Sequence, residues 1–470
     1  MDDDLLDDVH QRPSSSLLTC SFNQDGGCLA VGTTTGFSVH NIYPQYSLSV
    51  ERELRGGIGQ VEMLFRCNLM AIVGGGSTPH SAPHRVLIWD DHVPKEIGEL
   101  SFRQAVLSVK LRKDAIAVAL RDRAYVYHLA DLTLRDKIYT ADNPHGLLSL
   151  STQVQDMVLA CPSVTPGHVR VELYGLRKTV LLEAHDGELR ALCLTANGNL
   201  LATASVKGTI IRVWDVATSS CTHEFRRGVE RATITCLAFS WDDQWISCCS
   251  DKGTVHIFYK EDAEKVNETK NASTFSKLLG VSSRPKPKSV CQIRGVPHPL
   301  ACAFVGDAAN MLAVSGWDAD GNGVLLLSEF AAHQEARRVA YHVLVRNSVE
   351  ETEEERRRRR ARGWKPKLPD TPDNDFGNLL ISEPIMNHLS TRENDDDDFC
   401  EVVVEPPTEP PIDDKATESG ELASAKSASS RNENENKSKD TNTDDDDNSI
   451  TALQDSVQTE PMEEFLEAMQ

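Results

Sequence analysis

Short apolar runs separated by turn residues recur along the chain from Leu17 to about Leu344. In "LRALCLTANGNLLATASVKGTIIRVWDV" and "ITCLAFSWDDQWISCCSDKGTVHIF", an apolar run is followed by a turn rich in Asp, Asn and Gly, a second run, a Gly-containing turn and a third run. Self-similarity at a period of roughly 40 to 50 residues is typical of β-propellers, whose blades are four-stranded sheets. Dividing residues 15–345 by that period predicts an all-β fold, a β-propeller of about seven blades.

The charge of the chain is concentrated outside this repetitive region. The net charge is −22, and residues 346–470 hold 15 Lys and Arg against 33 Asp and Glu, a net of −18. We predict an acidic disordered N-terminus over residues 1–14, the propeller over residues 15–345 and a disordered acidic tail over residues 346–470. Such a polar tail cannot bury enough apolar surface to fold. A run of acids followed by a run of arginines, which can pair at i,i+4, favours a short charged helix at residues 349–362.

Composition and spacing exclude several classes of function. An acidic chain without a dense basic face repels nucleic acid, and no apolar window is long enough to span a bilayer. The N-terminus carries acids where a secretory signal would be basic. The 12 cysteines form no CxxC pair, so neither a zinc site nor a disulfide framework is predicted. We expect a cytoplasmic monomer without metal or cofactor, whose cysteines are mostly reduced core residues.

Two adjacent arginines, Arg226 and Arg227, precede Gly228 in the stretch "EFRRGVE", which lies between two predicted strands. Successive side chains of an extended backbone point in opposite directions, so we expect the two guanidinium groups to enter different surroundings. A guanidinium offers a fixed fork of N–H donors that suits phosphate oxygens, and a glycine leaves room for a headgroup. The doublet therefore indicates two anion sites on either side of one connection.

Hydroxyl-bearing and cationic residues flank the doublet in two similar sets. The stretches "SVKGTIIR" and "SDKGTVHI" share the pattern S-x-K-G-T. Hydroxyls can donate hydrogen bonds to phosphate oxygens, while Lys, Arg or His supplies positive charge. The upstream set is His185, Ser205, Lys207, Thr209 and Arg212, and the downstream set is Ser250, Lys252, Thr254 and His256. The alternative is that the arginines form ion pairs with Glu224 and Glu230, and that S-x-K-G-T is ordinary hairpin chemistry.

The stretch "RVWD" resembles the end of a WD40 repeat, and "FRRG" between "GTIIRVWD" and "SDKGTVHIF" resembles the PROPPIN family, the WIPI-type, WD40-like seven-bladed propellers. The likeness covers most of residues 15–345. It implies binding of phosphatidylinositol 3-phosphate and phosphatidylinositol 3,5-bisphosphate in autophagy, through two headgroup sites. By the resemblance, the first site is Arg226 with His185, Ser205, Thr209 and Arg212, and the second is Arg227 with Ser250, Thr254 and His256. Charge adds Lys207 to the first set and Lys252 to the second as weaker members.

A long segment after the predicted strand that ends at Tyr259 is expected to face a membrane. Residues 261–289 are too many for a hairpin, and their centre is apolar at Phe275, Leu278 and Leu279. In the family that the chain resembles, the corresponding loop of blade six inserts into membrane. Because one headgroup contact is weak, such an additional anchor would strengthen attachment. The alternative is a plain disordered insertion.

Two further stretches indicate protein partners. The turn "FNQDGG", with Asn23 and Asp25, is similar to the subgroup of the family that binds the lipid-transfer protein feeding the autophagosome; the alternative is a hairpin turn, which favours these residues anyway. The tail stretch "NDDDDFCEVVV" resembles the motif that binds ubiquitin-like autophagy modifiers. An extended segment can add to a sheet edge, with Phe399 and Val402 in two apolar pockets and the acids at a basic rim. Such short patterns also arise by chance.

The leading hypothesis is a non-enzymatic phosphoinositide effector that scaffolds autophagosome formation, peripheral on preautophagosomal and endolysosomal membranes. The alternative is a WD40-type protein-interaction scaffold without lipid binding, which would tolerate loss of the arginine doublet. Catalysis is the weakest hypothesis, because the sequence shows no recognisable Ser/His/Asp constellation, phosphate-binding loop or metal-ligand spacing.

Overall fold

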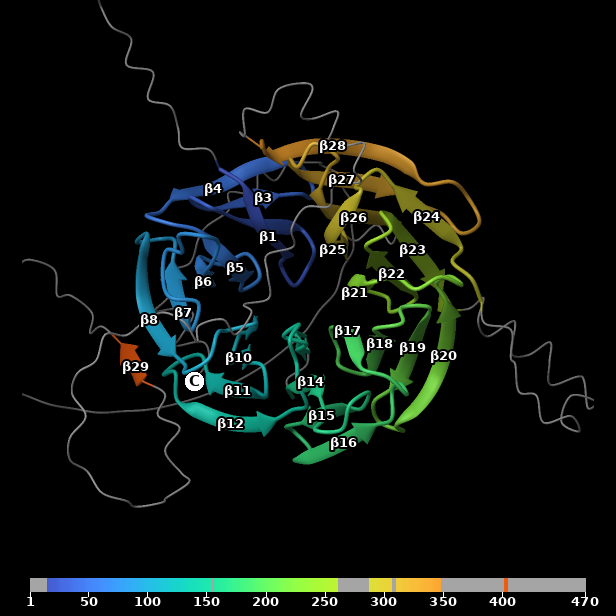
Figure 1. Ribbon diagram of the computed structural model, residues 1–470, viewed down its shortest axis with the longest axis horizontal. Coiled ribbons are helices and arrows are strands. Elements are labelled where there is room, and N and C mark those ends of the chain that lie inside the picture. Colours follow the sequence, from blue (N-terminus) through green and yellow to red (C-terminus); the bar gives the residue numbers. More distant parts are fainter. Residues whose placement is uncertain (1–14, 154–155, 261–286, 307–309, 348–400, 405–470) are drawn as a thin grey trace, which may run out of the picture. The chain divides into compact units, whose positions relative to one another are not determined.

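Seven antiparallel sheets form a ring in the computed structural model of this chain (Figure 1). The structure describes residues 15–153, 156–260, 287–306, 310–347 and 401–404. Within these residues, each sheet contains four strands that are consecutive in the sequence, each paired with the next, and one sheet has a fifth strand from the tail. The sheets are the blades of a propeller, numbered one to seven in chain order, and the first strand of each lies nearest the centre of the ring (Figure 1).

The strands of the first four blades are as follows. Blade one is β1 (Leu17–Phe22), β2 (Cys28–Thr33), β3 (Gly36–Asn41) and β4 (Ser47–Glu53). Blade two is β5 (Ile58–Met63), β6 (Leu69–Gly74), β7 (Arg85–Asp90) and β8 (Lys95–Ser101). Blade three is β9 (Ser108–Arg112), β10 (Ala115–Ala119), β11 (Arg123–His128) and β12 (Leu134–Tyr139). Blade four is β13 (Ser149–Leu150), β14 (Val158–Pro162), β15 (Val169–Leu173) and β16 (Lys178–Leu182).

The other three blades and one additional strand complete the described fold. Blade five is β17 (Leu189–Leu194), β18 (Leu200–Ser205), β19 (Ile210–Asp215) and β20 (Ser220–Arg226). Blade six is β21 (Ile234–Phe239), β22 (Trp245–Ser250), β23 (Thr254–Tyr259) and β24 (Cys291–Arg294). Blade seven is β25 (His298–Phe304), β26 (Met311–Trp317), β27 (Gly323–Glu329) and β28 (Arg337–Val345). β29 (Glu401–Val404) belongs to the tail and joins blade two beside β8.

The core consists of apolar clusters, each shared by two neighbouring blades. Middle strands such as β22 are buried along their whole length, because adjacent blades cover both faces of each sheet. The cluster between the last and first blades joins Val31 to Ala313 and Leu325, so side-chain packing closes the ring. Outer strands such as β4 are mostly exposed. Both blades that flank the arginine doublet are therefore held rigidly from two sides.

This architecture confirms the predicted all-β, seven-bladed propeller. Within the described ranges, the eleven cysteines are free and mostly buried, and no helix has the length and apolarity to cross a bilayer. The predicted acidic N-terminus, the charged helix at 349–362 and residues 261–286 of the predicted membrane loop lie outside the described residues. The sequence did not predict β29, a strand within the acidic tail.

Candidate functional site

The arginine doublet lies where the outermost strand of blade five ends. β20 pairs with β19 in a register that sets Arg226 opposite Ile210 and Glu224 opposite Arg212. Phe225, which lies between Glu224 and Arg226, is fully buried in the core shared with blade six. Because neighbouring side chains of a strand alternate between its faces, Arg226 shares the face of Glu224 and Arg212.

Arg227 is bound to the connection that follows β20. Its backbone N–H donates to the Thr209 carbonyl at 2.9 Å. Its guanidinium donates from Nε to the Gly208 carbonyl at 2.7 Å and from Nη2 to the Glu230 carbonyl. The Arg227 side chain therefore ties the connection between blades five and six to the turn before β19. Glu230 contributes its backbone oxygen to this contact, whereas the ion-pair alternative invoked its carboxylate.

A rim cavity of about 380 Å³ lies on the Arg212 face of blade five. It is lined by the five upstream residues predicted from sequence, His185, Ser205, Lys207, Thr209 and Arg212. Sequence reasoning missed Arg231, which also lines the cavity, together with the carboxylate residues Asp186 and Glu188. Arg226 is absent from the lining, but it lies opposite Ile210, which is part of it.

Arg212 is held in one orientation at the wall of this rim cavity. Its Nε donates to Glu224 Oε1 at 2.7 Å, and its Nη1 donates to the Ala184 carbonyl at 2.6 Å. A guanidinium has five N–H bonds, so three of them have no partner among the described residues. A fixed guanidinium with unused donors is suited to an anionic ligand, because little side-chain freedom remains to be lost on binding.

His185 belongs to a hydrogen-bonded chain inside blade five. Its Nε2 lies 3.0 Å from the Thr203 hydroxyl, which also accepts from Trp214 Nε1 at 3.1 Å. Burial, together with the positive charge of Arg212, lowers the pKa of His185 to about 4. The imidazole is therefore neutral at pH 7 and contributes hydrogen bonding, not charge, to the cavity wall.

The downstream set of residues gathers on blade six. Ser250 is fully buried, and its hydroxyl oxygen has no hydrogen-bond partner in the described structure. Burial and the charges of Arg227 and Arg294 lower the pKa of His256 to about 4. Thr254 is paired in register with Arg294, a cation that sequence reasoning missed because it follows the long insertion. Arg227 and Arg294 thus both lie close enough to His256 to act on its charge, and Ser250 adds an unsatisfied hydroxyl on the same blade. Cations and hydroxyls are the groups that bind phosphate oxygens.

The two S-x-K-G-T stretches form the same tight turn. The N–H of Gly208 donates to the Ser205 carbonyl at 2.8 Å, and that of Gly253 donates to the Ser250 carbonyl at 3.2 Å. Both glycines are left-handed, with φ of +62° and +70°, a conformation that L side chains rarely adopt. Hairpin chemistry therefore accounts for the glycines, but it does not account for the unpartnered hydroxyl of Ser250. Lys207 and Lys252 are exposed in these turns.

The described end of the long insertion, residues 287–289, contacts Arg226 on one side and His256 of the downstream set on the other. The Pro287 carbonyl accepts the Arg226 N–H at 2.8 Å, and Lys288 forms a parallel bridge with Arg226. The hydroxyl of Ser289 lies 3.0 Å from His256 Nδ1. Phe275, Leu278 and Leu279, the predicted membrane-inserting residues, lie outside the described residues.

The predicted protein-contact residues occupy separate places. Asn23 is buried, and its side chain bonds to the Phe65 carbonyl and the Cys28 N–H. Asp25 caps the same turn and pairs with Arg66 at 2.9 Å. Their bonds thus match the hairpin alternative, which leaves a contact role untested. Phe399 lies outside the described residues, and Val402 belongs to β29.

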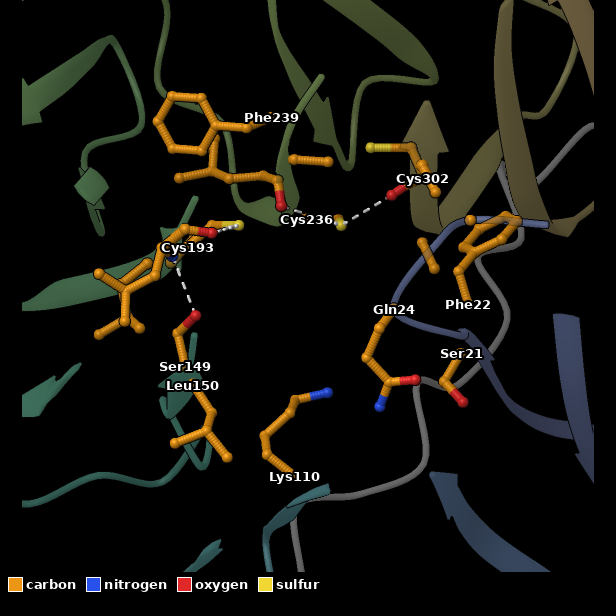
Figure 2. Close-up of a pocket in the computed structure, with 18 of the residues that line it drawn as sticks. Ser21, Phe22, Gln24, Lys110, Ser149, Leu150, Cys193, Cys236, Phe239 and Cys302 are labelled. Atoms are coloured by element: carbon orange, nitrogen blue, oxygen red, sulfur yellow. Dashed lines mark hydrogen bonds between the residues drawn. The ribbon is translucent and has the colours of Figure 1, made fainter. Parts of the chain in front are cut away.

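The centre of the ring holds a further cavity of about 440 Å³ (Figure 2). Figure 2 shows the side chain of Lys110 extending into it and Cys193, Cys236 and Cys302 at another part of its wall. Lys110 is paired with Glu62 at 2.9 Å. Burial raises the pKa of Cys193 to about 12, so this thiol stays protonated and is a poor nucleophile. Within the described residues, no group of three His, Cys, Asp or Glu could hold a metal ion.

The sequence profile of the PROPPIN family matches residues 16–284, which is more than half of the chain. The chain belongs to the PROPPIN family. The matched region includes blades one to five, most of blade six and the arginine doublet. The resemblance drawn from the "FRRG" stretch is thereby confirmed at the level of the family.

Among similar proteins, Autophagy-related protein 18e of Arabidopsis thaliana is 39% identical over 246 residues, which cover 52% of this chain and 65% of that protein. SVP1-like protein 2 of Neurospora crassa is 38% identical over 247 residues, covering 52% of this chain and 56% of the relative. The match thus spans less than two thirds of the length of each relative.

Solved propellers share the fold of this PROPPIN. Hsv2 of Kluyveromyces marxianus aligns with a TM-score of 0.56 and 22% identity, covering 71% of this chain and 100% of that one. The chain in a complex of KlAtg21 with the coiled-coil of AgAtg16 aligns with a TM-score of 0.57 and 23% identity, covering 70% and 99%. At these identities, the likeness shows a common architecture and no more.

Proposed function

We propose that this PROPPIN is a non-enzymatic phosphoinositide effector. It binds phosphatidylinositol 3-phosphate and phosphatidylinositol 3,5-bisphosphate through two rim sites on either side of the arginine doublet. The observation that carries the proposal is the rim cavity of about 380 Å³, which gathers Lys207, Arg212 and Arg231 with the hydroxyl residues Ser205 and Thr209. Cations and hydroxyls converging on one concave surface suit a phosphorylated sugar ring.

The charge of the first site supports one phosphorylated headgroup. Its lining has three cationic residues and two carboxylate residues, Asp186 and Glu188, and Arg212 is already paired with Glu224. Arg226 stands beside the lining with no guanidinium partner in the described part of the chain, so it can add a further charge when a ligand arrives. In this proposal, the carboxylates accept hydrogen bonds from the hydroxyls of the inositol ring, while the cations bind its phosphates.

The second site consists of Arg227, Ser250, Thr254 and His256, with Lys252 at its edge. The Ser250 hydroxyl has no hydrogen-bond partner in the described structure, and it would donate a hydrogen bond to an oxygen of a bound phosphate. In this proposal, the loop with Phe275, Leu278 and Leu279 inserts into the membrane as a third anchor. Two headgroup sites and one anchor on the same protein raise its overall affinity for the membrane, because each contact increases the effective concentration of the others. The protein would then lie peripherally on preautophagosomal and endolysosomal membranes.

Protein partners form the second part of the proposal. KlAtg21, which shares this fold, has been solved with the coiled-coil of AgAtg16. By analogy, this chain would scaffold autophagosome formation by recruiting proteins to a marked membrane, including the lipid-transfer protein through the turn of Asn23 and Asp25. The tail segment with Phe399 and Val402 would recruit a ubiquitin-like modifier. The fold is compatible with such scaffolding, because blades present many loops on a rigid ring.

Vesicle flotation tests the lipid proposal. The full-length chain is mixed with vesicles that contain phosphatidylinositol, its 3-phosphate or its 3,5-bisphosphate. The wild type should float only with the phosphorylated lipids, and Arg226→Thr/Arg227→Thr should stay at the bottom. A matched control is Arg337→Thr/Arg338→Thr, which removes an adjacent arginine pair from β28 in blade seven. This control should float like the wild type.

A variant that fills the rim cavity separates lipid binding from folding. Gly187 lines the cavity, and a Cβ added there meets no atom within 4 Å. Gly187→Leu should therefore leave the thermal midpoint unchanged and reduce flotation severalfold. If Gly187→Leu and the Arg226/Arg227 variant both float like the wild type, the rim cavity is no headgroup site. The protein-interaction scaffold without lipid binding would then be the better account.

A further inference from the structure

A short strand from the acidic tail lies on the outer edge of blade two (Figure 1). β29 runs antiparallel to β8, the outermost of the four consecutive strands of that blade. The paired residues are Glu401 with Ser101, Val402 with Leu100, Val403 with Glu99 and Val404 with Gly98. Across the described ranges, the other six blades have four strands and blade two has five.

The outer strand of a blade presents a row of backbone N–H and C=O groups that can pair with another chain. β8 pairs on its inner side with β7, and β29 occupies its outer side. Over the paired stretch Gly98–Ser101, the residues are buried or partly buried, whereas β16, the outer strand of blade four, exposes three of its five residues. By this pairing, the tail strand covers the outer edge of β8, whereas β4, β12 and β16 are the last strands of their sheets in the described part of the chain.

The sequence around β29 suits addition to a sheet edge. Three consecutive valines are β-branched and favour strands. Pro406 and Pro407 follow, and because proline has no N–H to donate, the ladder has a defined end. The run of acids at residues 395–398 precedes the strand. This pattern of acids, valines and prolines occupies one short segment of the acidic tail.

The linker is long enough for the tail to reach its own propeller. Residues 348–400 connect the end of blade seven to β29. These 53 residues can span at most roughly 180 Å. A domain of this size has a radius of gyration of roughly 20 Å. Tethering also raises the effective concentration of the strand toward the millimolar range, so four residue pairs can suffice.

We propose that the outer edge of blade two is a strand-addition site and that residues 401–404 of the chain's own tail occupy it. Pairing hides the backbone edge of β8 and holds the segment that follows the acidic run. A partner that recruits the segment around Phe399 must first release it, so its apparent affinity falls in proportion to the unpaired fraction. The site lies in blade two and is independent of the proposed headgroup sites in blades five and six.

Hydrogen–deuterium exchange of the full-length chain tests this pairing. In Val402→Pro/Val403→Pro, whichever of the two N–H groups faces β8 is removed, and the ladder cannot form. The control, Val402→Thr/Val403→Thr, keeps both N–H groups and the β-branched shape. All substitutions lie in the tail, so the fold of the propeller is not at risk. Peptides that cover residues 95–102 report on β8, and peptides from β4 and β16 serve as internal references.

We expect amides of β8 to exchange at least about tenfold faster in the proline variant than in the wild type, with the threonine control unchanged. β4 and β16 should exchange alike in all three proteins. Equal exchange of β8 in the wild type and the proline variant would overturn the proposal. So would protection of β8 that grows with protein concentration alongside a doubled mass in light scattering, because the occupying strand would then come from a second copy.

Discussion

The two arginines of the doublet differ in what they do for the fold, and this difference can be measured. The guanidinium of Arg227 donates to the Gly208 and Glu230 carbonyls, whereas that of Arg226 has no partner among the described residues. We therefore expect Arg227→Thr to lower the free energy of unfolding and Arg226→Thr to leave it within about 0.5 kcal/mol of the wild type. Both variants should lose affinity for phosphoinositide vesicles.

The size of the effect follows from the two lost hydrogen bonds. A hydrogen bond from a charged group contributes about 1.5 to 3 kcal/mol when buried, and Arg227 is only partly buried, so about 1 kcal/mol for each bond is reasonable. The unfolding entropy is about 2.1 cal/mol/K per residue, which gives roughly 0.7 kcal/mol/K for residues 15–345 treated as one cooperative unit. A loss of about 2 kcal/mol then lowers the midpoint by about 3 °C.

Differential scanning calorimetry on the full-length single variants provides the measurement. The control is Arg337→Thr on β28, whose exposed ion pair with Glu329 should contribute less than about 1 kcal/mol. Equal midpoints for Arg226→Thr and Arg227→Thr would refute the assigned roles, because the contacts of Arg227 would then carry no stability. If Arg226→Thr were the less stable of the two, the assignment would be reversed.

Three further predictions concern residues of the same region. Ser250→Ala should keep or raise stability by up to about 1 kcal/mol in chemical denaturation while weakening vesicle binding, because it removes a buried hydroxyl that has no partner in the described structure. Gly208→Ala should destabilise by at least about 2 kcal/mol, since its φ is +62° and the added Cβ would lie 1.8 Å from the Ala232 carbonyl oxygen; Gly228→Ala, whose Cβ meets nothing within 4 Å, should be neutral in the same assay. The pKa of His256 is lowered from 6.5 to about 4 in the folded protein. As the pH falls, the unfolded chain therefore binds a proton before the folded chain does. The contribution of His256 to the free energy of unfolding is full above pH 6.5 and is lost as the pH falls toward 4. The loss is on the order of 3 kcal/mol, and His256→Gln should remove about that much from the fall in urea-unfolding free energy between pH 7 and pH 4. The rest of the fall should persist, because the pKa values of His40, His145 and His185 are also lowered to about 4.

The fold was predictable because its signal is repeated. Most blades carry the same order of apolar runs and Gly-containing turns, so a blade that departs from it, such as blade three, is interpreted through its neighbours. The "FRRG" stretch, together with the flanking "GTIIRVWD" and "SDKGTVHIF", likewise identified the family. Local sequence also located the upstream residues, because His185, Ser205 and Arg212 lie on or beside neighbouring strands of one blade, where strand alternation fixes their faces.

Residues that depend on distant contacts were not predictable in the same way. Arg231 follows the doublet in an irregular connection, and Arg294 comes after a long insertion, so no period placed either beside the predicted sets. The strand at residues 401–404 was missed for a related reason. Composition assigns an acidic tail to disorder, but pairing with β8 depends on a sheet edge about 300 residues earlier, which no local pattern reveals.

The end of the insertion in blade six joins the two proposed headgroup sites. Pro287 accepts the backbone N–H of Arg226, and Ser289 is hydrogen-bonded to Nδ1 of His256. A neutral imidazole carries one N–H. When Nδ1 accepts the Ser289 hydroxyl, Nε2 keeps the proton and can donate it to a phosphate oxygen. The position of residues 287–289 therefore sets both the strand edge beside Arg226 and the hydrogen-bonding state of His256. A displacement of residues 287–289 would therefore reach both proposed sites, through the backbone hydrogen bond of Arg226 and the side-chain hydrogen bond of His256.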